Sequence, residues 1–268
     1  MIPTWQDLQN AGHGPQFDYE PGSPHLVHIS LRNRIATQIR AAVQRSFSRR
    51  GDCLVLEIGA GHGSFTEVAA ATGAGVTVTE MSASSAAVLS QRFANNSRVH
   101  VVHDSDGSLQ AAGGTPYDVV LCISVLHHIP DYLGHIATLL DLVAPGGDFI
   151  SYQDPLWYQR RTRRSMAASW GAYFAWRVSQ GNLTRGLRSR LRHLRGVLDE
   201  TLEEDMVEYH CLREGVDEQA MRNLLVPAFE SVALETYWST QNAALHRLGE
   251  SLGLQSTFGF VAKGRCRS

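Results

Sequence analysis

The sequence lacks the segments that would place the chain in a membrane or a secretory route. No apolar run approaches the roughly 20 residues needed to span a bilayer. The opening residues, MIPTWQDLQN, contain neither a basic stretch nor an apolar one, so no signal peptide is indicated. The four cysteines are scattered, and none forms the C-x-x-C pair that is typical of zinc sites. We therefore predict a reduced, cytoplasmic protein with no membrane partner.

A large charge of one sign is also missing. The formal net charge is -2 at pH 7, so no overall field would draw the chain to nucleic acid. The 268 residues are enough for one large α/β domain with a sizeable core, and no internal repeat is visible. These features favour a small molecule over nucleic acid as the substrate.

The sequence does contain a strand, a glycine-rich turn and a helix in direct succession, at residues 53–65, CLVLEIGAGHGSF. The apolar run at 54–56 is typical of a buried parallel strand. Gly59, Gly61 and Gly63 follow on alternate positions, and a helical pattern begins at Phe65. Because glycine has no Cβ, a ligand can approach the backbone closely at such a turn.

Strand and helix patterns alternate along the following residues. The expected strands are 52–58, 75–80, 98–103, 117–124, 148–153, 230–238 and 256–263, and the expected helices are 63–72, 83–95, 131–143 and 217–226. This alternation predicts a parallel sheet with helices on both faces. Ligands of such sheets bind at the carboxyl ends of the strands.

Polar residues are found at these strand ends. Glu80 ends the second expected strand, where a carboxylate can accept both hydroxyls of a ribose. His103, Asp104 and Ser105 end the third. Asp131 follows the fourth and is expected to cap the next helix. The sequence therefore predicts a nucleoside site at this edge, used either by NAD enzymes or by methyltransferases.

The glycine spacing separates these two classes. The dinucleotide fingerprint G-x-G-x-x-G would place its third glycine at position 64, which is Ser64. The pattern E-x-G-x-G-x-G, which begins at Glu57, instead resembles motif I of the class I S-adenosylmethionine (SAM)-dependent methyltransferases. The run SVLHHIPD at 124–131 and the P-G-G turn at 145–147 resemble later landmarks of the same family.

This resemblance implies a Rossmann-like, doubly wound sheet of seven strands in the order 3-2-1-4-5-7-6, with the last strand antiparallel. It implies SAM as the cofactor and S-adenosylhomocysteine (SAH) as its product. Asp104 would accept a hydrogen bond from the adenine amino group, with Asp106 as a substitute. The expected cofactor-binding residues are Glu57, Gly59, Ala60, Gly61, Gly63, Glu80, Met81, Asp104, Ser105 and Ser124.

Three residues are candidates for the chemistry of methyl transfer. His127 and His128 follow the fourth strand, and histidine is the side chain whose ordinary pKa lies near neutral pH. Asp154 ends the fifth strand and could orient an imidazole or accept the proton itself. The constellation resembles that of small-molecule O-methyltransferases. Which histidine is the base stays open, as does the alternative that they only pack on the cofactor. No set of metal ligands is recognised.

The chain divides into four parts: an N-terminal arm and helical lid (1–50), a SAM-binding core (51–154), a helical cap insert (155–215) and the C-terminal part of the sheet (216–268). Tyr19 and His25 could touch a ligand, or the helix at 25–48 could only complete the core. Trp157 and Tyr158 would line the substrate pocket. Alternatively, the aromatic residues of the insert form the core of its helices or a homodimer surface. Its arginines either bind an anionic substrate or form a solvated face.

Together these features predict a SAM-dependent methyltransferase that methylates a hydroxyl group of a small molecule, such as a natural product, a glycoside or a phenol. This activity would belong to small-molecule biosynthesis or secondary metabolism. Three alternatives stay open: a C- or N-methyltransferase of the same fold, an NAD-dependent oxidoreductase, and a non-catalytic SAM-binding protein that binds a partner through residues 155–215.

Overall fold

A computed structural model describes residues 22–179 and 215–267 of the chain. Its centre is a seven-stranded sheet in the order β3-β2-β1-β4-β5-β7-β6, so the expected order is confirmed. The strands are β1 (Leu54–Ile58), β2 (Gly75–Glu80), β3 (Val99–His103), β4 (Tyr117–Ile123), β5 (Val143–Pro155), β6 (Phe229–Tyr237) and β7 (Thr257–Arg265). The first five are parallel, and β7 runs antiparallel to both β5 and β6.

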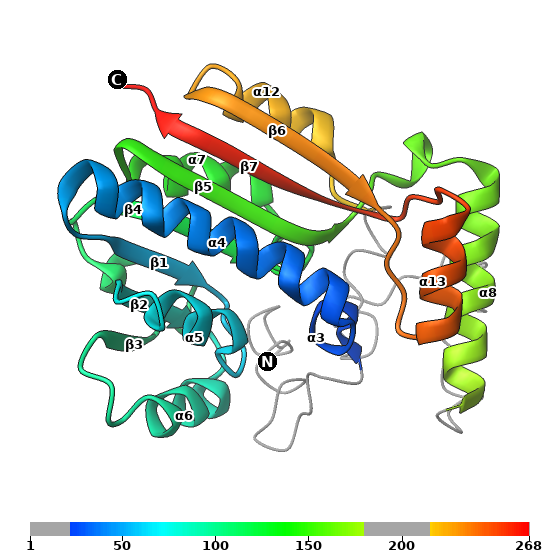
Figure 1. Ribbon diagram of the computed structural model, residues 1–268, viewed down its shortest axis with the longest axis horizontal. Helices are drawn as coiled ribbons and strands as arrows, with labels where there is room; N and C mark the ends of the chain where they lie inside the picture. The colour runs from blue at the N-terminus through cyan, green and yellow to red at the C-terminus, as the bar shows by residue number, and fades with distance from the viewer. Residues whose placement is uncertain (1–21, 180–214, 268) are drawn as a thin grey trace, which may run out of the picture.

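Helices cover both faces of the sheet (Figure 1). Those described are α3 (Pro24–Val27), α4 (Ile29–Arg50), α5 (Ser64–Ala70), α6 (Ala83–Arg92), α7 (Tyr132–Asp141), α8 (Arg163–Ser179), α12 (Glu218–Leu225) and α13 (Ala243–Ser251). Three single turns of 3-10 helix are η1 (Gln110–Ala112), η2 (Leu126–His128) and η3 (Tyr158–Arg160). One apolar cluster joins the sheet to α4, α5 and α6, and a second joins its other face to α7 and α12.

The N-terminal helical segment is a pair, a short α3 followed by a long α4. Leu31, Ile35, Ile39 and Val43 recur at helical spacing, and all are buried against the sheet. Ile29, at the start of α4, is 65% exposed. Because α4 packs along α5, β4 and β5, it mainly completes the core, which was the alternative to a lid across the cofactor site.

The fifth strand is longer than expected. It begins at Val143 rather than at Asp148, and the Pro145-Gly146-Gly147 turn lies inside it. The pairing with β4 steps from Tyr117–Val143 to Val119–Asp148, so the turn forms an irregularity within the strand. A part-buried ion pair, in which the buried Asp148 meets Arg45 of α4 at 2.6 Å, fixes the strand beyond this point.

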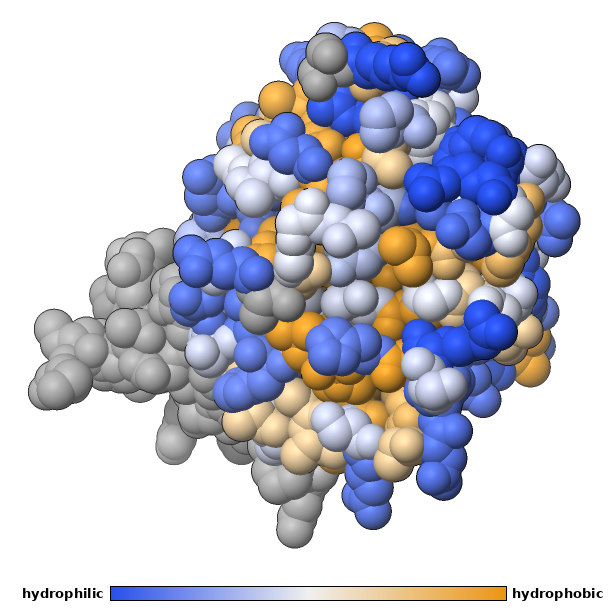
Figure 2. All heavy atoms as spheres, turned by 90° about the vertical axis from the view of Figure 1, so that its left-hand side faces the viewer, coloured by the Kyte–Doolittle hydropathy of each residue, from blue (hydrophilic) through white to orange (hydrophobic). Residues whose placement is uncertain are grey.

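The carboxyl ends of the parallel strands share one end of the sheet, where α8 and α13 also lie (Figure 1). On the face shown in Figure 2, hydrophilic side chains protrude and hydrophobic ones lie between and beneath them. Among the described helices, none has both the length and the apolar composition needed to cross a membrane.

Candidate cofactor and acceptor site

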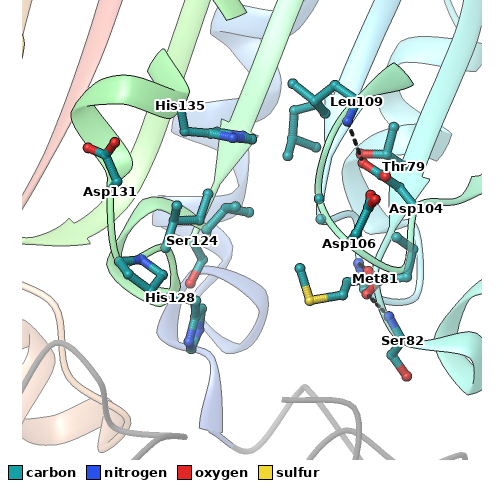
Figure 3. A pocket seen from close by; sticks show the side chains of 18 residues that line it. Thr79, Met81, Ser82, Asp104, Asp106, Leu109, Ser124, His128, Asp131 and His135 are labelled. Atoms are coloured by element: carbon teal, nitrogen blue, oxygen red, sulfur yellow. Dashed lines mark hydrogen bonds between the residues drawn. The ribbon is translucent and has the colours of Figure 1, made fainter. Parts of the chain in front are cut away.

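A pocket of about 430 Å³ opens at the carboxyl ends of β1, β2, β3 and β4. Figure 3 shows two walls: Thr79, Met81, Ser82, Asp104, Asp106 and Leu109 on one side, and Ser124, His128, Asp131 and His135 on the other. Gly59 and Gly61 also line it. This size is typical of a small-molecule site, and the position agrees with the strand-end prediction.

Glu80, the last residue of β2, also lines the pocket. One carboxylate oxygen accepts the backbone N–H of Gly61 at 2.9 Å, and the other accepts that of Ser82 at 3.1 Å. Burial raises the pKa of Glu80, while these two hydrogen bonds oppose the rise. A third backbone hydrogen bond, from Met81, also acts on this carboxylate. Since a carboxylate has about four acceptor positions, Glu80 retains capacity for a ribose hydroxyl.

Two aspartates follow β3 and line the pocket. Asp104 is buried and accepts the N–H of Leu109 at 3.1 Å, and burial raises its pKa. Asp106 is exposed and accepts the N–H of Ser108 at 2.9 Å. Of the two, the buried Asp104 is the better candidate to recognise an adenine amino group, because water competes less for it.

Four expected cofactor residues are not among those that line the pocket. The Glu57 carboxylate is buried and accepts the Thr66 hydroxyl at 2.6 Å, so it faces α5. A Cβ added to Gly63 would meet buried side chains of α6 and the residue that caps it. The other two are Ala60, which is half-buried, and the exposed Ser105. Their proposed contact with the cofactor therefore has no support from the pocket.

The end of β4 turns sharply at Ser124, whose φ is 62°. A single turn, η2, then carries Leu126, His127 and His128. Asp131 caps α7 by accepting the N–H of Gly134 at 3.0 Å, as predicted. His128 lines the pocket, and its ring centroid lies 4.0 Å from that of His127.

The structure joins His127 to Asp154. Nδ1 of His127 lies 2.8 Å from Oδ1 of Asp154, and the same oxygen accepts the His127 backbone N–H at 3.1 Å. The other oxygen accepts the Ser151 hydroxyl at 3.3 Å. Asp154 is 0% exposed, so it is placed to orient the imidazole rather than to meet a substrate.

The four candidate substrate residues lie outside this pocket or outside the described residues. His25 is buried and stacked 6.0 Å from Phe65, and burial lowers its pKa to about 4. Tyr19 falls in the part of the chain that the structure does not describe. Trp157 and Tyr158 are half-buried at η3, and neither lines the pocket. Of the insert, residues 180–214 also lie outside the described ranges.

One arginine of the insert is already engaged by carboxylates. Nε of Arg160 donates to Glu218 at 2.6 Å, and Arg160 also pairs with Asp217. This arginine therefore ties the start of the insert to α12. For Arg160 the structure favours a stabilising role over the binding of an anionic substrate.

His135 is a pocket residue that the sequence reasoning missed. It lies on α7 and points into the space opposite Leu109 (Figure 3). Burial lowers its pKa, with the Asp131 charge opposing, so burial favours the neutral imidazole. His135 follows Asp131 by four residues, a spacing that places the two side chains on one helix face. This spacing is the sequence signal that could have identified His135 as a pocket residue.

The strand order, the antiparallel last strand and the pocket above the glycine loop together define the class I methyltransferase fold. A family model described as "Methyltransferase domain" matches residues 31–204, more than half of the chain. The chain therefore belongs to this methyltransferase family. Family membership makes SAM the cofactor and sets the oxidoreductase alternative aside.

Two curated relatives carry the same name. The chain is 35% identical, over 94 residues, to a ubiquinone biosynthesis O-methyltransferase from Aromatoleum aromaticum, a match that spans 35% of the chain and 40% of the relative. A ubiquinone biosynthesis O-methyltransferase from Serratia proteamaculans is 36% identical over 98 residues, with 36% of the chain and 40% of the relative covered. The chain thus matches less than half the length of these relatives.

Solved structures show the same fold at low identity. The N-methyltransferase NodS from Bradyrhizobium japonicum, in complex with SAH, gives a TM-score of 0.55 at 16% identity, over 98% of both chains. The CurJ carbon methyltransferase gives 0.53 at 18% identity, over 90% of this chain and 57% of that one. The neighbours thus include enzymes named for nitrogen and for carbon, and the fold alone does not select the acceptor atom.

Proposed function

We propose that the chain transfers the methyl group of SAM to a hydroxyl group of a small molecule, with His127 as the base and Asp154 as its orienting partner. The 2.8 Å contact between Nδ1 of His127 and Asp154 carries this proposal. The names of the relatives, ubiquinone biosynthesis O-methyltransferases, support the choice of oxygen.

The residues of the first wall fit the cofactor. Glu80 would hold a ribose hydroxyl, Asp104 the adenine amino group, and Gly59 and Gly61 would offer backbone without a Cβ. When bound, SAM supplies a methyl group that its sulfonium already activates. The chain's own task is then to orient the acceptor, exclude water and remove one proton.

The buried pair is suited to removing that proton. Because the Asp154 carboxylate can only accept, the contact holds the neutral His127 ring with its hydrogen on Nδ1. The lone pair is then on Nε2, which can take the proton of an acceptor hydroxyl. Asp154 itself is fully buried, so the alternative in which it accepts the proton directly is disfavoured.

A positioned base distinguishes acceptor types. A neutral amine attacks a methyl group with its own lone pair, whereas a hydroxyl becomes a good nucleophile only as its proton leaves. His128 would contribute to the wall between cofactor and acceptor, since it lines the pocket and its ring contacts the buried ring of His127, which is not among the lining residues. We also propose that the insert shapes the acceptor site, that the protein acts in the cytoplasm, and that a homodimer would form through residues 155–215.

The test uses the purified chain with SAM carrying a ¹³C-labelled methyl group. It is offered phenols, glycosides, amines and compounds with an acidic C–H bond, and the product carbon shift identifies the acceptor atom. Transfer to oxygen that depends on His127 supports the proposal. Transfer only to nitrogen or carbon contradicts it, and calorimetry that detects SAH binding without any transfer would favour a non-catalytic role.

A further inference from the structure

The fifth strand carries an irregularity directly before Asp154. Tyr152 pairs with Gly259 of β7 and Asp154 pairs with Phe258, so the pairing skips Gln153, which is an extra residue in β5. Its φ is 71°, in the left-handed region that non-glycine residues rarely adopt. Two residues opposite one define a β-bulge. Since side chains alternate between faces, one extra residue moves the next side chain to the other face.

The two faces can be followed through their partners. Tyr152 belongs to the cluster that packs beneath α4. Regular alternation would return Asp154 to that face. Asp154 instead pairs with Phe258, which belongs to the cluster beneath α7, and it accepts the hydroxyl of Ser151. The bulge is therefore what brings Asp154 to the face where it meets His127.

Hydrogen bonds from β6 and the residues after it hold Gln153 in this conformation. Its backbone N–H donates to the Tyr237 hydroxyl at 3.0 Å, and that hydroxyl donates to the Gln153 side-chain oxygen at 3.3 Å. The side-chain nitrogen donates to the Ser239 hydroxyl at 2.7 Å. A strained residue persists only where its surroundings hold it, and the buried Tyr237 supplies the main support.

A second strained residue lies next to the bulge. Ser124, with a φ of 62°, follows β4 and donates its N–H to the carbonyl of Tyr152 at 2.7 Å. This hydrogen bond ties the end of β4 to the end of β5. It lies directly before the residues that lead to His127 after β4 and to Asp154 in β5.

We infer that Gln153 and Tyr237 are positioning residues, which hold the bulge that turns Asp154 toward His127. The inference rests on the proposed role of this pair in methyl transfer. It assigns a task to two residues that do not line the pocket.

The test compares Gln153→Val with Gln153→Gly. Both variants remove the side-chain amide, but valine resists a positive φ and glycine adopts it freely. The readout is the ¹⁵N spectrum of labelled histidine, which shows which ring nitrogen carries the hydrogen. The signals of His127 are assigned by their loss in His127→Gln. We expect the Nδ1–H form in the wild type and in Gln153→Gly, and its loss in Gln153→Val, with turnover lowered on the order of 100-fold.

Each outcome decides the inference. It is overturned if Gln153→Val keeps the Nδ1–H form, or if Gln153→Gly loses it equally. Should Gln153→Val fail to fold by circular dichroism, Tyr237→Phe decides in its place: loss of the Nδ1–H form supports the inference, and a wild-type spectrum overturns it. Failure of the proposed function can be distinguished from failure of this inference. If His127 and Asp154 had no role in methyl transfer, Asp154→Asn would change the ¹⁵N spectrum of His127 without lowering turnover.

Discussion

The two halves of the site are built in different ways. In the cofactor half, at the ends of β2 and β3, carboxylates accept backbone N–H groups of the adjoining loops: Glu80 accepts those of Ser82, 2 residues away, and of Gly61, 19 residues away. In the acceptor half, at the ends of β4 and β5, the contacts span more of the chain. His127 and Asp154 are 27 residues apart, and the support of the bulge comes from 84 residues away.

This difference separates binding from chemistry. The cofactor half depends on loop conformation, which a few glycines and one carboxylate fix locally. The acceptor half depends on where the strands place their side chains across the sheet. Substitutions in one half should therefore change affinity, and substitutions in the other should change turnover.

The largest expected effect is that of Asp154→Asn. An amide can donate to Nδ1, which would favour the wrong form of the His127 ring, and we expect kcat to fall roughly 100- to 10,000-fold. The affinity for SAH, measured by calorimetry, should stay near that of the wild type. Ser151→Ala, which removes only the 3.3 Å contact to the other carboxylate oxygen, is the matched control and should lower kcat far less. A large loss of SAH affinity in Asp154→Asn would contradict the view that the acceptor half controls turnover and not cofactor affinity.

The next effect concerns stability and the buried Glu57. Burial raises its pKa from 4.5 to about 7, while the Thr66 hydrogen bond opposes the rise. The folded chain therefore keeps a proton that the unfolded chain has already lost. As pH rises from about 4.5 to 7, the free energy of unfolding should fall by an amount on the order of 3 kcal/mol.

Glu57→Gln removes this titration and should flatten the dependence. Urea unfolding of both proteins between pH 5 and pH 8 measures this dependence. As pH rises, the free energy of unfolding of the variant should increase relative to that of the wild type. Parallel profiles would show that Glu57 does not titrate in this range. SAH affinity should change little, because Glu57 does not line the pocket.

A smaller effect is expected for Glu80→Gln in the cofactor half. It replaces a charged acceptor, so SAH binding should weaken roughly 10- to 100-fold with little change in kcat at saturating SAM. Since burial raises the pKa of Glu80, the wild type should also lose SAH affinity on acidification at a higher pH than an ordinary glutamate would. Calorimetry from pH 5 to pH 8 tests both points. Glu67→Gln, an exposed partner of Arg92, is the control, and equal losses in the two variants would contradict the role of Glu80.

The same contrast explains what the sequence could predict. The alternation of strands and helices predicts the parallel sheet and places Glu80 and His128 at strand ends, while the resemblance to the methyltransferase family adds the strand order and the role of Asp104. The bulge at Gln153 follows from neither, because residues 148–155 have the pattern of a regular strand and the hydroxyl that holds the bulge belongs to Tyr237. Long-range hydrogen bonds of this kind leave no local signature.

Glycine positions show the same limit. Gly63 completes the family's glycine pattern and was expected to touch the cofactor, yet its neighbours are Leu89 and Phe93. Spacing alone cannot tell a glycine that admits a ligand from one that admits a packed helix. A pair of substitutions separates these roles.

The smallest effect is the difference between Gly63→Ala and Gly51→Ala. Both glycines lie in the left-handed helical region, with φ of 82° and 80°, so both variants carry similar backbone strain. A Cβ at Gly63 would lie 2.6 Å from the Phe93 ring, whereas one at Gly51 meets nothing within 4 Å. Gly63→Ala should therefore be less stable by a further ~1–2 kcal/mol, measured as a lower Tm. If the Tm values match and SAH binding weakens instead, Gly63 is a cofactor contact and the boundary of the cofactor half must include it.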